Sequence, residues 1–441
     1  MSWFHRIISR LKSKNDIWHV IKNNFQLYVF ILLALLLPFT KTYLPYLMFL
    51  WVMSGVLAIH KISKNYHKSF ILLLLPVVFY SVHIIGFIYT QDIKNGLFDL
   101  EMKLSIIFIP VVVFFITDKV KANYRVLLKL FVYGNLGASL VCLLFAINNT
   151  VVFTESGISI EHMVWPTITK GLSFFQLINQ RFSYFSYGFL SIFHHPTYFS
   201  IYILFSIVIL VYLIRSAQKK RTGYYFLIIY FTIFLWLLGS RAAFLTYLVS
   251  LSSFFIILIV RFKRYWIGLF LLVAGIFLSI VVFSNLQIQK NINETLEIVK
   301  DKPLNEHSDI RLWLWKSGFE IFQDNLWVGV GTGDINSALN KKYEEYNLKL
   351  ANEHNLNAHN QYLDTSLKLG AVGLTILLGW IIFTFYITIK RKQFLFFYFM
   401  LIISINFLFE VILNSIAGVA FFAFFYSLLF SVYNRSQVEE E

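Results

Sequence analysis

The sequence predicts an all-α, polytopic membrane protein with about 12 transmembrane helices and a large helical loop on the external side. Hydrophobic residues make up 58% of the chain and charged residues only 14%, whereas soluble domains average roughly 25% charged. Apolar runs of about 17–25 residues recur from end to end, and each is long enough to cross a bilayer as a helix. Short basic clusters separate alternate runs, as expected for loops that stay in the cytoplasm.

The apolar runs place the expected spans to within a few residues. Nine spans precede the longest hydrophilic stretch and three follow it. The predicted spans are 25–39, 43–59, 70–89, 104–116, 126–147, 188–213, 223–238, 242–260, 265–283, 371–389, 393–409 and 411–432.

Six basic clusters fall on one side of this twelve-span arrangement. Representative members are Arg10, Lys64, Lys121, Lys220, Arg264 and Arg391. The positive-inside rule assigns that side to the cytoplasm, together with both chain ends. The net charge of +15 is therefore distributed as short loops, and not as the continuous basic stripe that nucleic-acid binding requires.

Two features of the chain bear on its processing and on its covalent stabilisation. The first 24 residues are basic and amphipathic, but no small-residue cleavage site follows the next apolar run, so we expect a retained first span. The single cysteine, Cys142, lies inside an apolar run, so no disulfide framework is expected to hold the external loops.

Three regions follow from the hydropathy pattern. Residues 1–283 would form transmembrane helices 1–9, residues 284–368 an external loop, and residues 369–441 helices 10–12 and a cytoplasmic tail. The loop combines basic, acidic, histidine and asparagine side chains, and long structured loops on a rigid scaffold commonly carry binding or catalysis. The connection 148–187 and the charged run 341–346 match no motif.

Arg241 stands between two closely spaced apolar runs, at the external end of the predicted bundle. A guanidinium at that depth is costly unless it meets an anion. The alternative is an interfacial arginine that extends its stem to the membrane surface.

Arg311 opens an amphipathic segment in the loop, with Ser308 as the expected N-cap. Leu312, Trp315, Phe319 and Phe322 share one helical face, and Arg311 falls at the edge of that face. A helix lying on the membrane would direct Arg311 to lipid headgroups, and a snorkelling charge is the alternative.

His359 lies near the end of the loop. If it begins a helix, it shares a stripe with Leu363, Ser366, Gly370 and Gly373, in which the small residues would let a neighbouring span approach closely. Imidazole ordinarily ionises close to neutral pH, which suits general-base chemistry. A solvated loop histidine is the alternative.

Weaker signals remain open. His354 and His359 with Glu353 and Asp364 could be read as a metal site, although the five-residue spacing turns the histidines off one helical face. The glycine-rich segment 329–333 lacks the context of a phosphate-binding loop and is interpreted as a turn. His195 would line a lumen or cap a helix. Glu410 is either solvated at the interface or a partner for the arginines.

In their order along the chain these residues resemble the O-antigen ligase and O-antigen polymerase superfamily of bacterial envelope glycosyltransferases. The resemblance covers roughly 190 residues and rests on Gly239-Ser240-Arg241, on Arg311 with Trp315 and the glycines 329, 331 and 333, and on His359-Asn360 with Leu363, Gly370 and Gly373.

The resemblance implies a GT-C-like fold in the cell inner membrane, with the loop in the periplasm. It also implies an inverting, metal-independent glycosyltransferase without cofactor, which transfers or polymerises glycan from an undecaprenyl-diphosphate-linked donor onto a glycan, lipid A core or protein hydroxyl. His359 would be the base, and Arg241 and Arg311 would grip the diphosphate through bidentate hydrogen bonds. Further expected substrate contacts are His195, Asn360, Tyr362, and, from proximity alone, Lys316 and His354.

A transporter or flippase of lipid-linked oligosaccharides is the main alternative, because it too would need about twelve spans and intramembrane arginines. A flippase, however, requires charged residues along a central cavity, whereas the polar residues here concentrate on one external loop. A purely structural membrane protein is the third reading, and it would leave these arginine and histidine side chains without a role.

Overall fold

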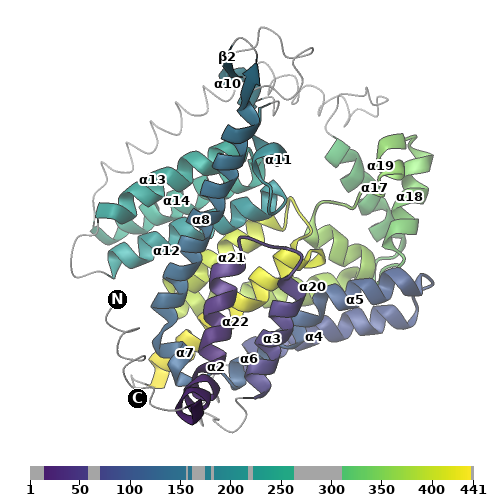
Figure 1. Cartoon of the computed structure of the whole chain (residues 1–441). Helices are drawn as coiled ribbons and strands as arrows, with labels where there is room; N and C mark the ends of the chain where they lie inside the picture. The colour runs from purple at the N-terminus through teal and green to yellow at the C-terminus, as the bar shows by residue number, and fades with distance from the viewer. Residues whose placement is uncertain are drawn as a thin grey trace. The chain divides into compact units, whose positions relative to one another are not determined.

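A computed structural model describes residues 14–57, 70–154, 157–160, 174–179, 183–216, 222–262 and 310–438 (Figure 1). This part of the chain is almost entirely α-helical, with one antiparallel hairpin in which β1 (Val151–Thr154) pairs with β2 (Gly157–Ile160). The predicted span 265–283, the first part of the predicted external loop and the expected cap Ser308 lie outside the described residues.

Four helices are long and apolar enough to cross a membrane, judged by length and composition. They are the segments Ile71–Ile88 of α4, Tyr124–Thr150 of α8, Pro196–Arg215 of α12 and Gln361–Lys390 of α20. Shorter apolar helices accompany them. The prediction of an α-helical membrane protein is therefore confirmed, while the number of twelve spans stays a prediction.

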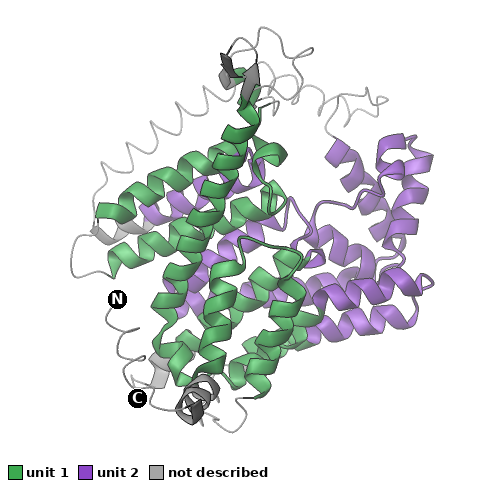
Figure 2. Ribbon diagram, viewed as in Figure 1, with its two compact units in different colours: residues 1–77, 104–237, 416–441 green, residues 78–103, 238–415 purple. Residues whose placement is uncertain are grey.

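The chain divides into two compact units (Figure 2). Unit 1 contains residues 1–77, 104–237 and 416–441, and unit 2 contains residues 78–103 and 238–415. The helix α4 (Phe70–Ile88) begins in unit 1 and ends in unit 2, and α5 (Ile93–Ile107) leads back to unit 1.

The core of unit 1 consists of large aromatic and aliphatic side chains. Phe131 of α8 packs edge-on against Phe425 of α22, and the hydroxyl of Tyr202 in α12 donates to the carbonyl of Ala417. Its elements are α2 (Lys14–Leu36), α3 (Leu44–Val56), α6 (Ile109–Phe114), α7 (Asp118–Ala122), α8 (Tyr124–Thr150), β1, β2, α10 (Phe174–Asn179), α11 (Tyr187–Leu190), α12 (Pro196–Arg215), α13 (Thr222–Leu237) and α22 (Ile416–Val438).

Unit 2 combines apolar helices with a small helical subdomain. Besides the end of α4 and most of α5, its elements are α14 (Arg241–Phe262), α17 (Ile310–Asp324), α18 (Ile335–Glu345), α19 (Lys349–Glu353), α20 (Gln361–Lys390), α21 (Phe394–Asn406) and the 3-10 turn η2 (Ile412–Asn414). In the subdomain, α17, α18 and α19 share a core that includes Trp313, Leu339 and the fully buried Tyr343.

Several predicted spans differ from the helices observed, and three of them have a clear structural reason. The span predicted for 188–213 begins eight residues later in the structure, because α12 begins at Pro196. Proline lacks an N–H group and is therefore favoured in the first turn of a helix. The span 411–432 begins later, at Ile416, because η2 occupies residues 412–414. The span 104–116 is replaced by α5 and the short α6, so helix starts eleven residues earlier, at Ile93.

The helix α20 is broken at Gly370, where φ is 64° and ψ is −161°. This backbone conformation is essentially restricted to glycine. Before the break the helix is polar and buried, with Asp364 and Lys368, and after it the helix is apolar. The predicted start of the following span at residue 371 therefore coincides with a structural boundary.

The glycine-rich loop between α17 and α18 fills this break. The N–H groups of Val330 and Gly331 donate to the carbonyls of Leu367 and Lys368, at 2.8 and 3.1 Å, and the N–H of Ala371 donates to the carbonyl of Leu326 at 2.7 Å. These bonds satisfy backbone groups that the break removes from the helix, which is required where a helix is interrupted away from water. The segment 329–333 is thus a turn, as interpreted, but a turn that inserts against a helix.

Candidate functional site

His359 and Glu410 form a pair in unit 2. Nδ1 of His359 lies 3.4 Å from Oε1 of Glu410, and the two side chains are 28% and 8% exposed. Because an ionised carboxylate only accepts hydrogen bonds, Nδ1 of a neutral imidazole would carry the proton and Nε2 would keep its lone pair. Such an arrangement prepares Nε2 to accept a proton.

His359 is held by the loop that precedes α20. Its φ is 46°, and its N–H donates to Oδ1 of Asn357 at 2.8 Å. The helix begins only after Asn360, whose Oδ1 accepts from the N–H groups of Tyr362 and Leu363. The predicted stripe from His359 to Gly373 on one helix is therefore wrong, because His359 precedes the helix and Gly370 interrupts it.

The close approach expected at Gly370 does occur, but its neighbour is a loop. A Cβ atom at Gly370 would lie 2.2 Å from the carbonyl carbon and oxygen of Trp327. The glycine on α17 serves helix packing instead, because a Cβ at Gly318 would meet the side chain of Leu363 at 2.8 Å. α17 is thereby seated directly on the first half of α20.

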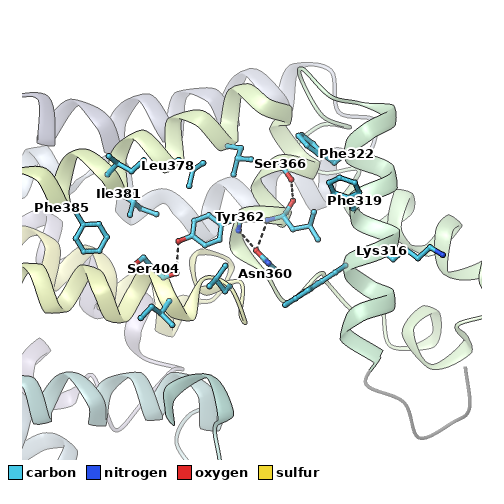
Figure 3. Close-up of a pocket in the computed structure, with 16 residues that line it drawn as sticks. Lys316, Phe319, Phe322, Asn360, Tyr362, Ser366, Leu378, Ile381, Phe385 and Ser404 are labelled. Carbon is cyan, nitrogen blue, oxygen red and sulfur yellow. Dashed lines mark hydrogen bonds between the residues drawn. The ribbon is translucent and has the colours of Figure 1, made fainter. Parts of the chain in front are cut away.

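An apolar groove of about 950 Å³ extends from Asn360 along α20 (Figure 3). α17 contributes Trp315, Phe319 and Phe322, which confirms most of the apolar face predicted for this segment. Below the break at Gly370, the groove follows α20 on one face. The remaining lining residues are Lys316, Tyr362, Leu363, Ser366, Leu374, Leu378, Ile381, Ile382, Phe385, Ser404, Ile405 and Leu408.

Tyr362 and Asn360 lie at the polar end of this groove. The hydroxyl of Tyr362 donates to the carbonyl of Ser404 at 2.9 Å, and its ring stands edge-on to Phe407. Asn360 uses its carbonyl oxygen to cap α20. Both residues border the groove (Figure 3), so a role in substrate contact stays a prediction for them.

Arg241 is the first residue of α14 and is exposed. Five residues further on, Oγ1 of Thr246 accepts a hydrogen bond from Nδ2 of Asn406, at 3.0 Å. Asn406 ends α21, four residues before Glu410. The helix end that carries Arg241 therefore lies at the same end of unit 2 as the His359–Glu410 pair.

Arg311 is half-buried in the first turn of α17. One turn later, the indole N–H of Trp315 donates to the carbonyl of Ala358 at 2.9 Å. Since Ala358 adjoins His359, this hydrogen bond ties the start of α17 to the histidine loop. The fold thus brings both arginines to the region of the histidine.

Lys316 and His354 are placed differently. The ammonium of Lys316 lies over the rings of Trp313 and Tyr346, at 5.0 and 5.2 Å, and Figure 3 shows it extending away from the groove. Tyr346 donates to Glu320 at 2.5 Å, and this hydrogen bond raises the pKa of Tyr346 above its ordinary value. His354 is exposed at the end of α19. Among the described residues, no three histidine, cysteine or acidic side chains gather as a metal site would require.

His195 belongs to unit 1. It immediately precedes α12, and its ring stands edge-on to Tyr187 and Tyr198, with centroids 5.9 and 6.2 Å away. His194 is the more buried of the neighbouring histidines, and its Nε2 lies 3.0 Å from the carbonyl of Leu37. His195 therefore stands at the N-cap position of α12, but its side chain makes no capping hydrogen bond.

Two features of the site were missed by sequence reasoning. Glu410 was not assigned to His359, from which it is separated by 51 residues. A buried cluster of four charged residues also went unrecognised: Asp99 and Lys103 on α5, and Asp364 and Lys368 on α20. Its sequence signal is the acid-to-lysine spacing of four residues, which occurs in both pairs and places each pair on one helical face.

Comparison with known proteins gives one family match. A search of the curated proteins returned no match for this chain. Residues 225–378 match the model of the O-antigen ligase family. The matched segment contains Arg241, Arg311 and His359 and most of the groove. The chain is thus similar to the O-antigen ligase family over residues 225–378, and this match confirms the resemblance to the O-antigen ligase and polymerase superfamily.

Proposed function

We propose that this protein is a membrane glycosyltransferase, which transfers glycan from a polyprenyl-diphosphate donor, expected to be undecaprenyl-linked, to an acceptor hydroxyl. The family match implies glycan transfer of the O-antigen ligase type. The observation that carries the finer proposal is the His359–Glu410 pair beside an apolar groove, in the unit that also contains Arg241 and Arg311.

The groove has properties that suit the lipid part of such a donor. From Leu374 to Phe385 it follows eleven helical steps, or about 17 Å at 1.5 Å per residue. That length is roughly half of a hydrocarbon core of about 30 Å, so the groove would accompany one leaflet. Its wall is largely aliphatic and aromatic, which suits an isoprenoid chain and offers few partners to a sugar.

The arginines would serve the diphosphate. A diphosphate carries its charge at the membrane surface, and guanidinium groups bind phosphate oxygens in bidentate fashion. Arg241 and Arg311 stand at the end of unit 2 that holds His359. As the glycosyl bond breaks, negative charge accumulates on the diphosphate, and these cations would stabilise it.

In the proposed reaction the acceptor hydroxyl gives its proton to Nε2 of His359 while its oxygen attacks the anomeric carbon. The new glycosidic bond forms as the bond from that carbon to the diphosphate oxygen breaks, and the electron pair leaves on polyprenyl diphosphate. Attack from the face opposite the leaving group inverts the anomeric configuration. Glu410 would stabilise the imidazolium that forms, and the proton returns to water afterwards.

The test uses the purified protein reconstituted in vesicles that contain a lipid-linked oligosaccharide, together with a soluble or lipid-anchored glycan acceptor. We expect a new glycosidic product and release of polyprenyl diphosphate, with the anomeric configuration of the product inverted by NMR. If the glycolipid crosses the bilayer and no glycosidic bond forms, the transfer proposal fails and the translocation alternative replaces it.

A further inference from the structure

The helix α5 buries two charged side chains. Its buried face carries Asp99 and the fully buried Lys103, whereas Leu97 and Phe98 are 54% and 58% exposed. The exposed face also carries the charged Lys94 and Glu101, so what distinguishes α5 is the pair of charges on its buried face. Charges buried away from water are costly unless they are paired and hydrogen-bonded.

The buried charges form one connected network. Nζ of Lys103 donates to Oδ1 of Asp99 at 2.6 Å and to Oδ1 of Asn414 at 2.5 Å. Nζ of Lys368 bridges Asp99 and Asp364, at 2.7 and 2.9 Å. Nδ2 of Asn414 closes the circuit by donating to the carboxylate of Asp364 at 3.1 and 3.2 Å. We call these five residues the charge network.

Stability alone does not account for the charge network. Two lysines and two aspartates make the network neutral. However, a protein in which well-packed apolar side chains replace a buried ion pair is often as stable as the original or more stable. What such a network supplies is a defined geometry. Asn414 illustrates this, because its carbonyl oxygen and its amide nitrogen each have a specific partner and its side chain cannot be turned over without losing both.

The geometry that it defines belongs to the candidate catalytic pair. Asp364 follows His359 by five residues, and Asn414 follows Glu410 by four. Between these points, the N–H of Gln361 donates to the carbonyl of Phe407 at 2.7 Å, and its Oε1 accepts from the N–H of Leu413 at 2.8 Å. The two segments that carry the pair are therefore cross-linked by hydrogen bonds.

We infer that Lys103 is a positioning residue: through Asn414 it holds the turn that carries Glu410 against the loop that carries His359. This role rests on the proposed function, because it matters for transfer only if the pair acts on an acceptor. Lys103 itself touches neither His359 nor Glu410 in the contacts described above, so it acts through Asn414 and Asp364.

The first experiment compares three variants with the wild type in the transfer assay. Lys103→Met leaves a net negative cluster and is expected to lower the Tm. The double variant Asp99→Asn/Lys103→Met restores neutrality without restoring the contact to Asn414. We expect its Tm to recover to within a few degrees, its KM for the donor to stay within about twofold, and its kcat to remain at least tenfold low. Lys94→Met, an exposed lysine on the same helix, should behave as wild type.

A fourth variant removes the contacts of Asn414 and leaves the charges in place. Asn414→Leu retains all four charged residues but removes both contacts of the amide, so it should lower kcat as the double variant does. Recovery of kcat in parallel with Tm in the double variant, or a wild-type kcat in Asn414→Leu, would show that the network is merely structural and overturn the inference.

A third measurement does not depend on enzymatic activity. Diethyl pyrocarbonate acylates accessible imidazoles, and mass spectrometry reads each site separately. His359 should be labelled at least threefold faster in the double variant and in Asn414→Leu than in the wild type, while the exposed His354 should be labelled at an unchanged rate. Equal rates at His359 in all proteins would overturn the inference. If the wild type transfers no glycan, the proposed function fails, and this labelling still decides the positioning role.

Discussion

Replacing Glu410 with glutamine tests the catalytic pair with little change of shape. The variant keeps an oxygen that can accept from Nδ1 of His359, but it loses the charge that would stabilise an imidazolium. At 3.4 Å, an effective dielectric constant of about 20 gives a Coulomb attraction of roughly 5 kcal/mol. Because the imidazole is 28% exposed, water reduces this value, and a charged hydrogen bond in a protein is worth about 1.5–3 kcal/mol.

That range corresponds to a loss of about 10- to 100-fold in kcat, at roughly 1.4 kcal/mol per factor of ten. The assay is glycan transfer by purified protein at saturating donor and acceptor, with Glu101→Gln, an exposed acid on α5, as the matched control. The KM for the donor should change little, since Glu410 itself does not line the groove. A kcat within twofold of wild type would refute the assignment of Glu410 as the partner of the base.

Three further predictions concern the groove, the helix break and the arginines. Leu378→Trp should obstruct the groove and raise the KM for a long-chain donor at least fivefold. Gly379→Trp, at the next position but with open space around it, should leave this KM unchanged. Equal KM values for the two variants would exclude the groove as the lipid site. Gly370→Ala should lower the free energy of unfolding by about 2–4 kcal/mol, because φ is 64° and the added Cβ would clash with the backbone of Trp327. An unchanged Tm would contradict the observed break. Arg241→Lys and Arg311→Lys should each lower kcat/KM about tenfold through loss of the bidentate fork, whereas wild-type rates would reduce both to simple positive charges.

Hydropathy predicted the helices that behave as uniformly apolar segments. The predicted span 70–89 and the observed α4, Phe70–Ile88, agree almost residue for residue, as do 223–238 and α13, Thr222–Leu237. It failed for α5, because charged residues, including the buried Asp99 and Lys103, lower the mean hydropathy of this helix. Besides Lys103 on the same helix, Asp99 is paired with Lys368 on α20, 269 positions away, which no local window includes.

The candidate site was only partly accessible from sequence for a related reason. Motif order singled out His359, but the helical periodicity suggested a stripe that the positive φ of His359 and the break at Gly370 exclude. A single sequence gives no measure of backbone conformation at such positions. The partnership with Glu410 is a long-range contact, fixed by the turn that follows α21 and by the hydrogen bonds of Gln361.

The most direct measurement of the central claim is the rate of glycan transfer by His359→Ala, compared with wild type and with Lys349→Ala, an exposed residue of the same subdomain. General-base catalysis typically contributes 10²–10⁴-fold. We predict that His359→Ala binds the lipid-linked donor as wild type does and loses at least about 100-fold in kcat, while Lys349→Ala retains full activity. Transfer by His359→Ala at the wild-type rate would contradict the assignment of the base, and with it the mechanism built on this pair.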